Sequence, residues 1–254
     1  GRGAGAAGAA GGGAAVVEAT QGTLLGGRVR YAQPRDGYRT GIEPVLLAAS
    51  VPALAGDLVI EAGAGAGAGL MCLATRVSGV RGIGVEIDPA MADLARANVA
   101  DNGLAGLTIL TGDVTTVALP PASHVMANPP WHDPRSTASP VARRRLAKQE
   151  SAGIEAWVVA LARALIPGGS LTMIVPPALA MRAAAACTAA GLGNGVDMSL
   201  APKLGRTPKL TLMQRWAGKS GTVRESQIVL HEDGGGYLPE IDAVLRGGDQ
   251  LGLG

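Results

Sequence analysis

Residues 57–69, DLVIEAGAGAGAG, join a short apolar run to a glycine loop, and the next five residues begin an apolar stretch typical of a helix. A strand, a glycine loop and a helix in this order let the backbone approach a ligand closely, with the helix amides pointing at it. The strand ends in an acid, Glu61, which suits a cation better than a pyrophosphate. The stretch predicts the first strand and ligand loop of an α/β fold.

The glycine loop has other interpretations. Gly63, Gly65 and Ala68 also match the spacing of a dinucleotide-binding fingerprint, whose third glycine can be Ala. Because the chain is rich in Ala and Gly, such a match arises easily by chance, and a purely structural loop is a further alternative. The rest of the chain has to decide among them.

The next unit repeats the strand-to-helix order. Residues 82–87 predict a strand that carries Glu86 at its end, and Asp88-Pro89 predicts the start of a helix that runs to about residue 102. Glu86 lies 19 residues after Gly67, the spacing of a carboxylate that binds ribose hydroxyls. A third strand at 107–110 is followed by Gly112 and Asp113. This alternation predicts a doubly wound parallel sheet.

A fourth strand, at 124–127, leads into Asn128-Pro129-Pro130-Trp131. The Asn128 side-chain oxygen and the backbone carbonyl beside it can accept both hydrogens of a planar amino group, while the prolines fix the backbone. Trp131 offers a surface on which a flat ring can stack. The alternative is a Pro-Pro turn with an incidental aromatic residue.

Periodicity predicts the remaining elements, some before and some after these units. The expected upstream elements are a strand or hairpin at 26–33 and a helix at 42–50. Downstream we expect a helix at 150–165, a strand at 170–175, a helix at 176–190, a strand pair at 196–200 and 209–216, a strand at 227–230 and a helix at 238–245.

Composition limits the class of protein. Hydrophobic residues are 47% of the chain and charged residues 17%, which is a soluble globular profile. No window of about 18 residues is apolar enough to span a membrane. Cys72 and Cys187 are far apart in apolar segments, so we expect buried free thiols in a cytoplasmic protein without a metal site. The net charge of +2 does not by itself indicate a nucleic-acid partner.

The acid after the first strand, Asp113 after the third and the Asn-Pro-Pro-aromatic motif after the fourth together resemble the class I S-adenosylmethionine-dependent methyltransferases that methylate amino nitrogens. Within this class the layout resembles the tRNA adenine-N6 methyltransferases that modify the anticodon-loop adenine of a valine tRNA. The resemblance begins at residues 33–43, QPRDGYRTGIE, and covers most of residues 24–247. Trp131 stands where the family more often has Phe or Tyr, and Ala64 where it often has Cys.

The resemblance implies a fold, a cofactor and a substrate. The fold would be a mostly parallel seven-stranded sheet with a C-terminal antiparallel hairpin. Its domains would be a flexible Gly/Ala tail at 1–22, a strand and helix at 23–52, the methyltransferase domain at 53–218 and an extension packing on it at 219–254. The cofactor would be S-adenosylmethionine and the substrate tRNA. The sequence leaves the oligomeric state open, and we favour a monomer.

The resemblance also assigns site residues. Those expected to bind S-adenosylmethionine are Glu61, Gly63, Gly65 and Gly67 at its methionyl part, Glu86 and Ile87 at its ribose, Asp113 and Val114 at its adenine, and Tyr38 and Arg39 as a cover. Those expected to hold the target base are Asn128, Pro129, Pro130 and Trp131.

Basic residues suggest where RNA would bind. Arg143, Arg144, Arg145 and Lys148 follow the motif closely and could contact phosphates, and Lys203, Arg206 and Lys209 form a second group. Basic runs are often just solvated faces, so this is an expectation drawn from position. His132 after the motif is better explained as a solvent-facing turn residue than as a catalytic base.

Four other functions are alternatives to tRNA adenine methylation. Ribosomal-RNA guanine-N2 and protein-glutamine methyltransferases share the four-residue motif. A binding module that holds S-adenosylmethionine or RNA without turnover would not need the Asn128 acceptors. A nicotinamide dehydrogenase would need an acid for hydride transfer, and the sequence offers no candidate.

Overall fold

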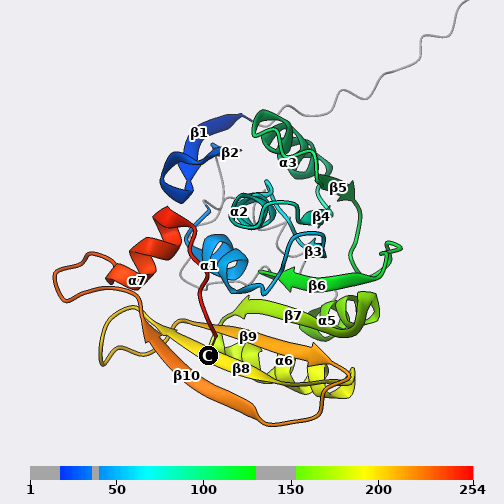
Figure 1. Cartoon of the computed structure of the whole chain (residues 1–254), viewed down its shortest axis with the longest axis vertical. Helices are drawn as coiled ribbons and strands as arrows, with labels where there is room; N and C mark the ends of the chain where they lie inside the picture. The colour runs from blue at the N-terminus through cyan, green and yellow to red at the C-terminus, as the bar shows by residue number, and fades with distance from the viewer. Residues whose placement is uncertain (1–17, 36–39, 130–152, 254) are drawn as a thin grey trace, which may run out of the picture.

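The computed structural model describes residues 18–35, 40–129 and 153–253. Its centre is an eight-stranded sheet in the order β10-β8-β9-β7-β6-β3-β4-β5 (Figure 1). The strands of this sheet are β3 (Leu58–Ala62), β4 (Arg81–Glu86), β5 (Leu107–Thr111), β6 (Ala122–Ala127), β7 (Leu165–Val175), β8 (Leu192–Ala201), β9 (Leu210–Ala217) and β10 (Val223–Val229). Only β9 runs antiparallel to its neighbours, so the carboxyl ends of the other seven share one edge.

Helices cover both faces of the sheet and define two cores. The helices are α1 (Glu43–Ser50), α2 (Ala68–Arg76), α3 (Pro89–Asp101), α5 (Gly153–Ala164), α6 (Pro177–Ala189) and the short α7 (Pro239–Asp242), which continues as a π-turn over Ala243–Gly247. One core joins α1, α2 and α3 to the sheet, and the other joins α5 and α6 to its opposite face. Met126 of β6 enters the first core and Val125 the second, as expected of a strand buried on both faces.

The α/β class and the mostly parallel sheet are confirmed, but the sheet has eight strands where seven were expected. The difference is β10, which pairs in parallel with β8 over the whole of Val223–Val229. A shorter strand at residues 227–230 was expected, because the polar residues 224–227 give no alternating pattern. In the structure residues 223–227 are the exposed part of this strand. The strand pair β8–β9 forms the predicted antiparallel hairpin.

The N-terminal hairpin consists of β1 (Ala19–Leu24) and β2 (Val29–Pro34), joined by the 3-10 turn Leu25–Gly27. Residues 19–22 therefore belong to a strand, whereas the sequence had placed them in a flexible tail. The hairpin is fastened to α3, because Asn102 accepts a hydrogen bond from the Arg30 amide at 2.8 Å and donates to its carbonyl at 2.7 Å. This attachment holds the start of β2 against the end of α3.

The C-terminal residues return to the N-terminal segment. The Leu251 amide donates to the Ala49 carbonyl of α1 at 2.9 Å, and the Arg28 guanidinium donates to the Gly247 carbonyl. Figure 1 shows α7 and the residues after it lying across the side of α1. The C-terminal residues therefore pack against the N-terminal segment, on the side of the first core.

Candidate active site

The glycine loop between β3 and α2 lies at the carboxyl edge of the sheet. Gly63, Gly65 and Gly67 have φ angles of +67°, +55° and +89°, in the left-handed region that disfavours side chains. A Cβ on Gly63 would also lie 2.8 Å from the Trp157 ring of α5. The loop backbone at Gly63 thus packs against the buried Trp157 ring, and the loop conformation requires glycine at these positions.

Glu61, at the end of β3, is 3% exposed and accepts a hydrogen bond from the Leu70 amide in the first turn of α2 at 2.8 Å. Burial raises the pKa of this carboxyl to about 8, because desolvation outweighs the hydrogen bond from Leu70 and the nearby Glu86 charge acts in the same direction. The site thus holds an acid that a bound cation would help to ionise.

Glu86, at the end of β4, is 1% exposed and reaches back to the glycine loop. Its carboxylate accepts hydrogen bonds from the Gly65 amide and the Asp88 amide, each at 2.9 Å. Ile87 follows it and is half-buried. The two acids predicted at successive strand ends therefore both contact backbone around the same loop.

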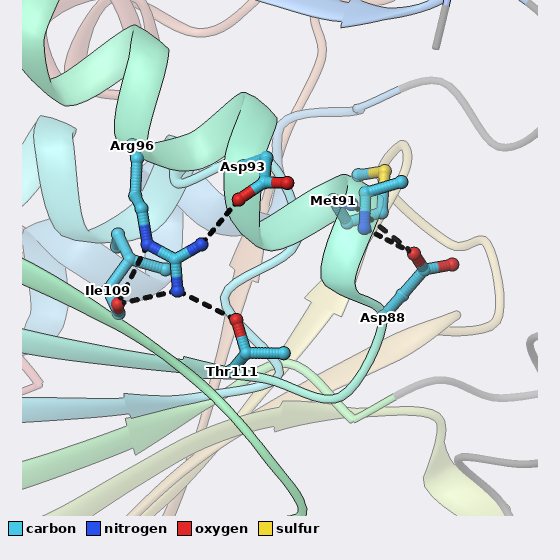
Figure 2. A network of polar contacts seen from close by, with 7 residues as sticks. Asp88, Met91, Asp93, Arg96, Ile109 and Thr111 are labelled. Atoms are coloured by element: carbon cyan, nitrogen blue, oxygen red, sulfur yellow. Dashed lines mark hydrogen bonds and ion pairs between the residues drawn. The ribbon is translucent and has the colours of Figure 1, made fainter. Parts of the chain in front are cut away.

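Asp113 follows β5 and fixes the turn after it. Its carboxylate accepts from the Thr115 amide at 2.8 Å and from the Thr115 hydroxyl at 2.7 Å, while Val114 is buried. Figure 2 shows Arg96 of α3 reaching the end of β5, where its guanidinium donates to the Ile109 carbonyl and to the Thr111 hydroxyl, at 3.0 and 2.7 Å. Arg96 thus holds the strand end that precedes Asp113.

At the start of α3, the predicted cap Asp88 accepts a hydrogen bond from the Met91 amide at 3.3 Å.

Asn128 and Pro129 follow β6 directly, half-buried and buried respectively. The β3–β6 register pairs Ala62 with Ala127, so the next residues, Gly63 and Asn128, leave the sheet side by side. The Asn128 motif therefore begins next to the glycine loop. The other predicted site residues, Tyr38, Arg39, Pro130, Trp131, Arg143, Arg144, Arg145 and Lys148, and also His132, lie outside the described residues.

Sequence reasoning missed Asn98, which joins the hairpin to the glycine loop. Its buried side-chain amide donates to the Ala32 carbonyl at 2.8 Å and to the Ala66 carbonyl at 2.9 Å, and its oxygen accepts from the Ala32 amide at 2.9 Å. Its position in the sequence could have indicated a buried polar contact. Asn98 follows Ala92 and Ala95 at helical spacing, so it is a polar residue on an apolar face.

A second missed contact joins the end of the hairpin to the same site. The Tyr31 hydroxyl lies 2.7 Å from the Thr40 hydroxyl, and Gln33 accepts from the Thr40 amide at 3.0 Å. Burial raises the pKa of Tyr31 to about 12, opposed by the Thr40 hydrogen bond and assisted by the negative charge of Glu61. Tyr31 and Thr40 thus lie on the hairpin side of the Glu61 carboxylate.

The residues present fit S-adenosylmethionine, whose amine and sulfonium are cationic. In addition to Glu61 and Glu86, the carboxylate of Glu43 has a buried oxygen, Oε2, with no hydrogen-bond partner in the described part of the chain. Glu43 begins α1, which ends beside the end of α2, since Arg76 donates to the Val51 carbonyl at 2.6 Å. The ends of the two helices therefore lie together. Glu61 and Glu86, the buried acids beside the glycine loop, suit a cationic ligand.

The fold and the matched domain define a class I, S-adenosylmethionine-dependent methyltransferase. Residues 59–169 match a family described as a methyltransferase domain. The chain is 25% identical over 214 residues to the tRNA1(Val) (adenine(37)-N6)-methyltransferase of Tolumonas auensis, covering 84% of this chain and 90% of that protein.

Solved structures show the same fold. A predicted O-methyltransferase from Agrobacterium tumefaciens superposes with a TM-score of 0.68 at 24% identity, covering 83% of this chain and 98% of its own. A methyltransferase from Pyrococcus furiosus gives a TM-score of 0.56 at 16% identity, covering 75% and 90%. Both comparisons show a similarity of fold alone.

A cluster at the opposite edge of the sheet has the residue types of a hydrolase triad. His124 Nδ1 lies 2.8 Å from the Ser170 hydroxyl, and His124 Nε2 lies 3.3 Å from an Asp57 oxygen. Ser170 is 0% exposed, so no substrate can reach its hydroxyl. Burial lowers the pKa of His124 despite the Asp57 carboxylate, so the contact joins a neutral imidazole to an acid. The cluster is a buried polar link between strands.

The described part of the chain has neither a membrane-spanning helix nor a cluster of metal-binding side chains. No helix there is long and apolar enough to cross a membrane. No group of three or more His, Cys, Asp or Glu side chains in those ranges is placed to hold a metal ion. Cys72 and Cys187 are both buried free thiols there, as predicted.

Proposed function

We propose that this methyltransferase transfers a methyl group from S-adenosylmethionine to N6 of an adenine in tRNA, the anticodon-loop adenine of a valine tRNA. The observation that carries the proposal is the position of Asn128, which leaves β6 beside Gly63 of the glycine loop. An acceptor pair for an amino group thus begins next to the loop assigned to the cofactor. A cytoplasmic location is compatible with the two buried free thiols.

In this proposal the cofactor is held by residues at three strand ends. Glu61 and the backbone of Gly63, Gly65 and Gly67 bind the methionyl part, Glu86 and Ile87 the ribose, and Asp113 and Val114 the adenine, with Tyr38 and Arg39 as a cover. The Glu86 carboxylate would exchange its bond with the Gly65 amide for one with a ribose hydroxyl. Support comes from the burial of both acids and from their contacts with the glycine loop.

The chemistry asked of the protein is mainly positioning. The cofactor, when bound, supplies an electrophilic methyl group. Asn128 and the backbone carbonyl at Pro129 accept the two amino hydrogens and draw the nitrogen lone pair out of conjugation with the ring, while Pro130 and Trp131 hold the base. The amino nitrogen would form its bond to the methyl carbon as the bond between that carbon and the cofactor sulfur breaks, which leaves the neutral thioether S-adenosylhomocysteine, and the nitrogen would then lose a proton to water. No His or Cys has a chemical role.

The choice of tRNA adenine is supported by the relative from Tolumonas auensis and by the cost of exposing the base. An adenine in a loop is already unpaired, so less energy is needed to extrude it than from a helix. Arg143, Arg144, Arg145 and Lys148 are proposed to contact phosphates beside it. Binding should therefore weaken steeply as salt is added.

The test is transfer of labelled methyl from S-adenosylmethionine to unmodified bulk tRNA, followed by nuclease digestion and identification of the labelled nucleoside. We expect N6-methyladenosine, and we expect it to disappear when tRNA(Val) is removed from the pool. Label in guanine-N2 of ribosomal RNA, or in protein glutamine, with none in tRNA, would refute the proposed substrate. Cofactor binding with no label in any acceptor would indicate a non-catalytic binding module.

A further inference from the structure

Two segments of the C-terminal region lie at the same edge of the sheet as Asn128. The 202–209 loop, Pro202 to Lys209, follows β8, and the 230–237 turn, Leu230 to Tyr237, follows β10. Both strands run parallel to β7 and β6, so their carboxyl ends point the same way. Figure 1 shows the two segments, in yellow and orange, projecting on the same side as α7.

The two segments are tied into one unit. The His231 ring nitrogen Nδ1 lies 2.9 Å from the Pro202 carbonyl, and the Lys203 ammonium donates to the Asp233 carbonyl at 3.0 Å. The His231 and Tyr237 rings stack with centroids 4.6 Å apart and planes at 28°. The 230–237 turn therefore supports the 202–209 loop through these contacts.

The outer surface of the loop combines cations with an apolar side chain. Arg206 and Lys209 are exposed, Lys203 is half-buried, and Leu204 between them is 79% exposed. The loop thus places an apolar side chain, on which a base can pack, beside cations that can contact phosphates. Among the acids of the facing turn, Glu232 and Asp233 are exposed and oppose this charge in part.

The distance between the loop and Asn128 follows from the strand order. From β6 the order runs through β7 and β9 to β8, which is three strand steps. At about 4.8 Å per step this is about 14 Å across the sheet. The register places Asn128 level with Met198, so Pro202 lies about 13 Å further along the strand direction, and the loop begins about 20 Å from the base-acceptor residues. A nucleic-acid strand advances about 3.4 Å per nucleotide when stacked, and more when extended, so about 20 Å corresponds to about six nucleotides at most.

We infer that the 202–209 loop is a second RNA-binding surface, an inference that rests on the RNA substrate proposed above. Lys203, Arg206 and Lys209 contact phosphates of the same strand about six nucleotides from the target base, and Leu204 packs on an unpaired base. The chemistry favours a single-stranded loop, because its bases are free to be splayed over an apolar side chain.

The test compares two triple variants with equal loss of charge. The first carries Lys203→Gln, Arg206→Gln and Lys209→Gln. The control carries Arg81→Gln, Arg163→Gln and Lys219→Gln, whose residues are exposed at the opposite edge of the sheet. Measured for each are the Kd for unmodified tRNA at several salt concentrations, the Kd for S-adenosylmethionine and the Tm.

We expect the loop variant to bind tRNA about tenfold more weakly at 0.1 M salt, with a salt slope smaller by about 2, while the control binds nearly as the wild type. Cofactor affinity should be unchanged in both. Tm should stay within about 3 °C of the wild type, because the exposed Lys203–Asp233 hydrogen bond that the loop variant loses contributes little to stability. Glu232→Gln with Asp233→Asn should instead tighten tRNA binding, because it removes opposing charge.

Equal weakening by both triple variants would overturn the inference, since only net charge would then matter. If the wild-type chain methylates tRNA and the loop variant binds it unchanged, the inference fails alone and the proposed function stands. If the wild type neither binds nor methylates RNA, the proposed function fails and the inference with it.

Discussion

The carboxylate of Glu61 accepts a hydrogen bond from the backbone amide of Leu70 at 2.8 Å, in a setting where burial raises its pKa to about 8. A cationic amine binds the ionised carboxylate better than the neutral acid. Cofactor binding should therefore require Glu61 to lose a proton, and the Kd for S-adenosylmethionine should fall about tenfold per pH unit between pH 5.5 and 7. Calorimetric titration in buffers of different ionisation enthalpy measures both the Kd and the proton released.

The control is Glu61→Gln, which keeps an acceptor for the Leu70 amide but cannot ionise. It should bind the cofactor weakly and with little dependence on pH over the same range. A wild-type Kd that stays constant from pH 5.5 to 7 would rule out the proposed role of Glu61.

The same carboxyl should make stability depend on pH. Its pKa is raised from 4.5 to about 8 in the folded chain, so between these values the folded state holds more protons than the unfolded state. Its contribution to stability is present below pH 4.5 and is lost as pH rises through 8, at about 1.4 kcal/mol per unit. Urea unfolding at pH 5, 6, 7 and 8 should show that the free energy of unfolding of Glu61→Gln rises relative to that of the wild type, by about 1.4 kcal/mol per pH unit. Parallel stability curves would contradict this prediction.

Asn98→Ala should weaken cofactor binding, because the Ala66 carbonyl of the glycine loop and both polar groups of Ala32 lose their buried partner. The free energy of unfolding should fall by on the order of 3 kcal/mol. Asn102→Ala is the matched control, since Asn102 binds the same hairpin at Arg30 without touching Ala66. An equal rise in the Kd for S-adenosylmethionine in both variants would show that only the hairpin attachment matters.

Gly63→Ala should reduce cofactor binding by at least tenfold, because φ is +67° and the new methyl group would lie 2.8 Å from the Trp157 ring. The nearest ring atoms belong to the six-membered ring of the indole. Gly63→Ala combined with Trp157→Phe should recover part of the lost affinity, since Phe withdraws those atoms, while the cost of the positive φ remains. Affinities that are simply additive across the four proteins would argue against contact between the two sites.

The strands around the site were predictable because buried parallel strands are short apolar runs bounded by glycines and acids. Residues 58–62, between Asp57 and Gly63, form a strand of this kind. The predicted strand at 124–127 is the last part of β6, which lies between Pro121 and Asn128. β1 and β10 were mispredicted, because exposed strands carry polar side chains and the pairing of their backbone with a neighbour leaves no mark on composition. Local sequence does not specify such pairing.

Within the site, residues at strand ends could be predicted from order alone, since successive parallel strands end at one edge. Asn98 could not, because its function depends on two segments, at Ala32 and Ala66, that meet only in the folded chain. Its neighbours along the helix indicate burial but give no partner. Long-range hydrogen bonding was the missing information.

Asn128→Ala tests the chemical step itself. The variant loses the side-chain acceptor for the amino hydrogens but leaves the glycine loop and its acids unchanged, so kcat should fall by about 100-fold or more while the Kd for S-adenosylmethionine stays within about twofold. Single-turnover methyl transfer to tRNA measures the first quantity, and calorimetry the second. Asn128→Asp is the informative companion, since it keeps an acceptor of the same shape and should retain part of the rate. Equal losses of rate and cofactor affinity would place Asn128 in the cofactor site, next to Gly63, and would remove it from the base site.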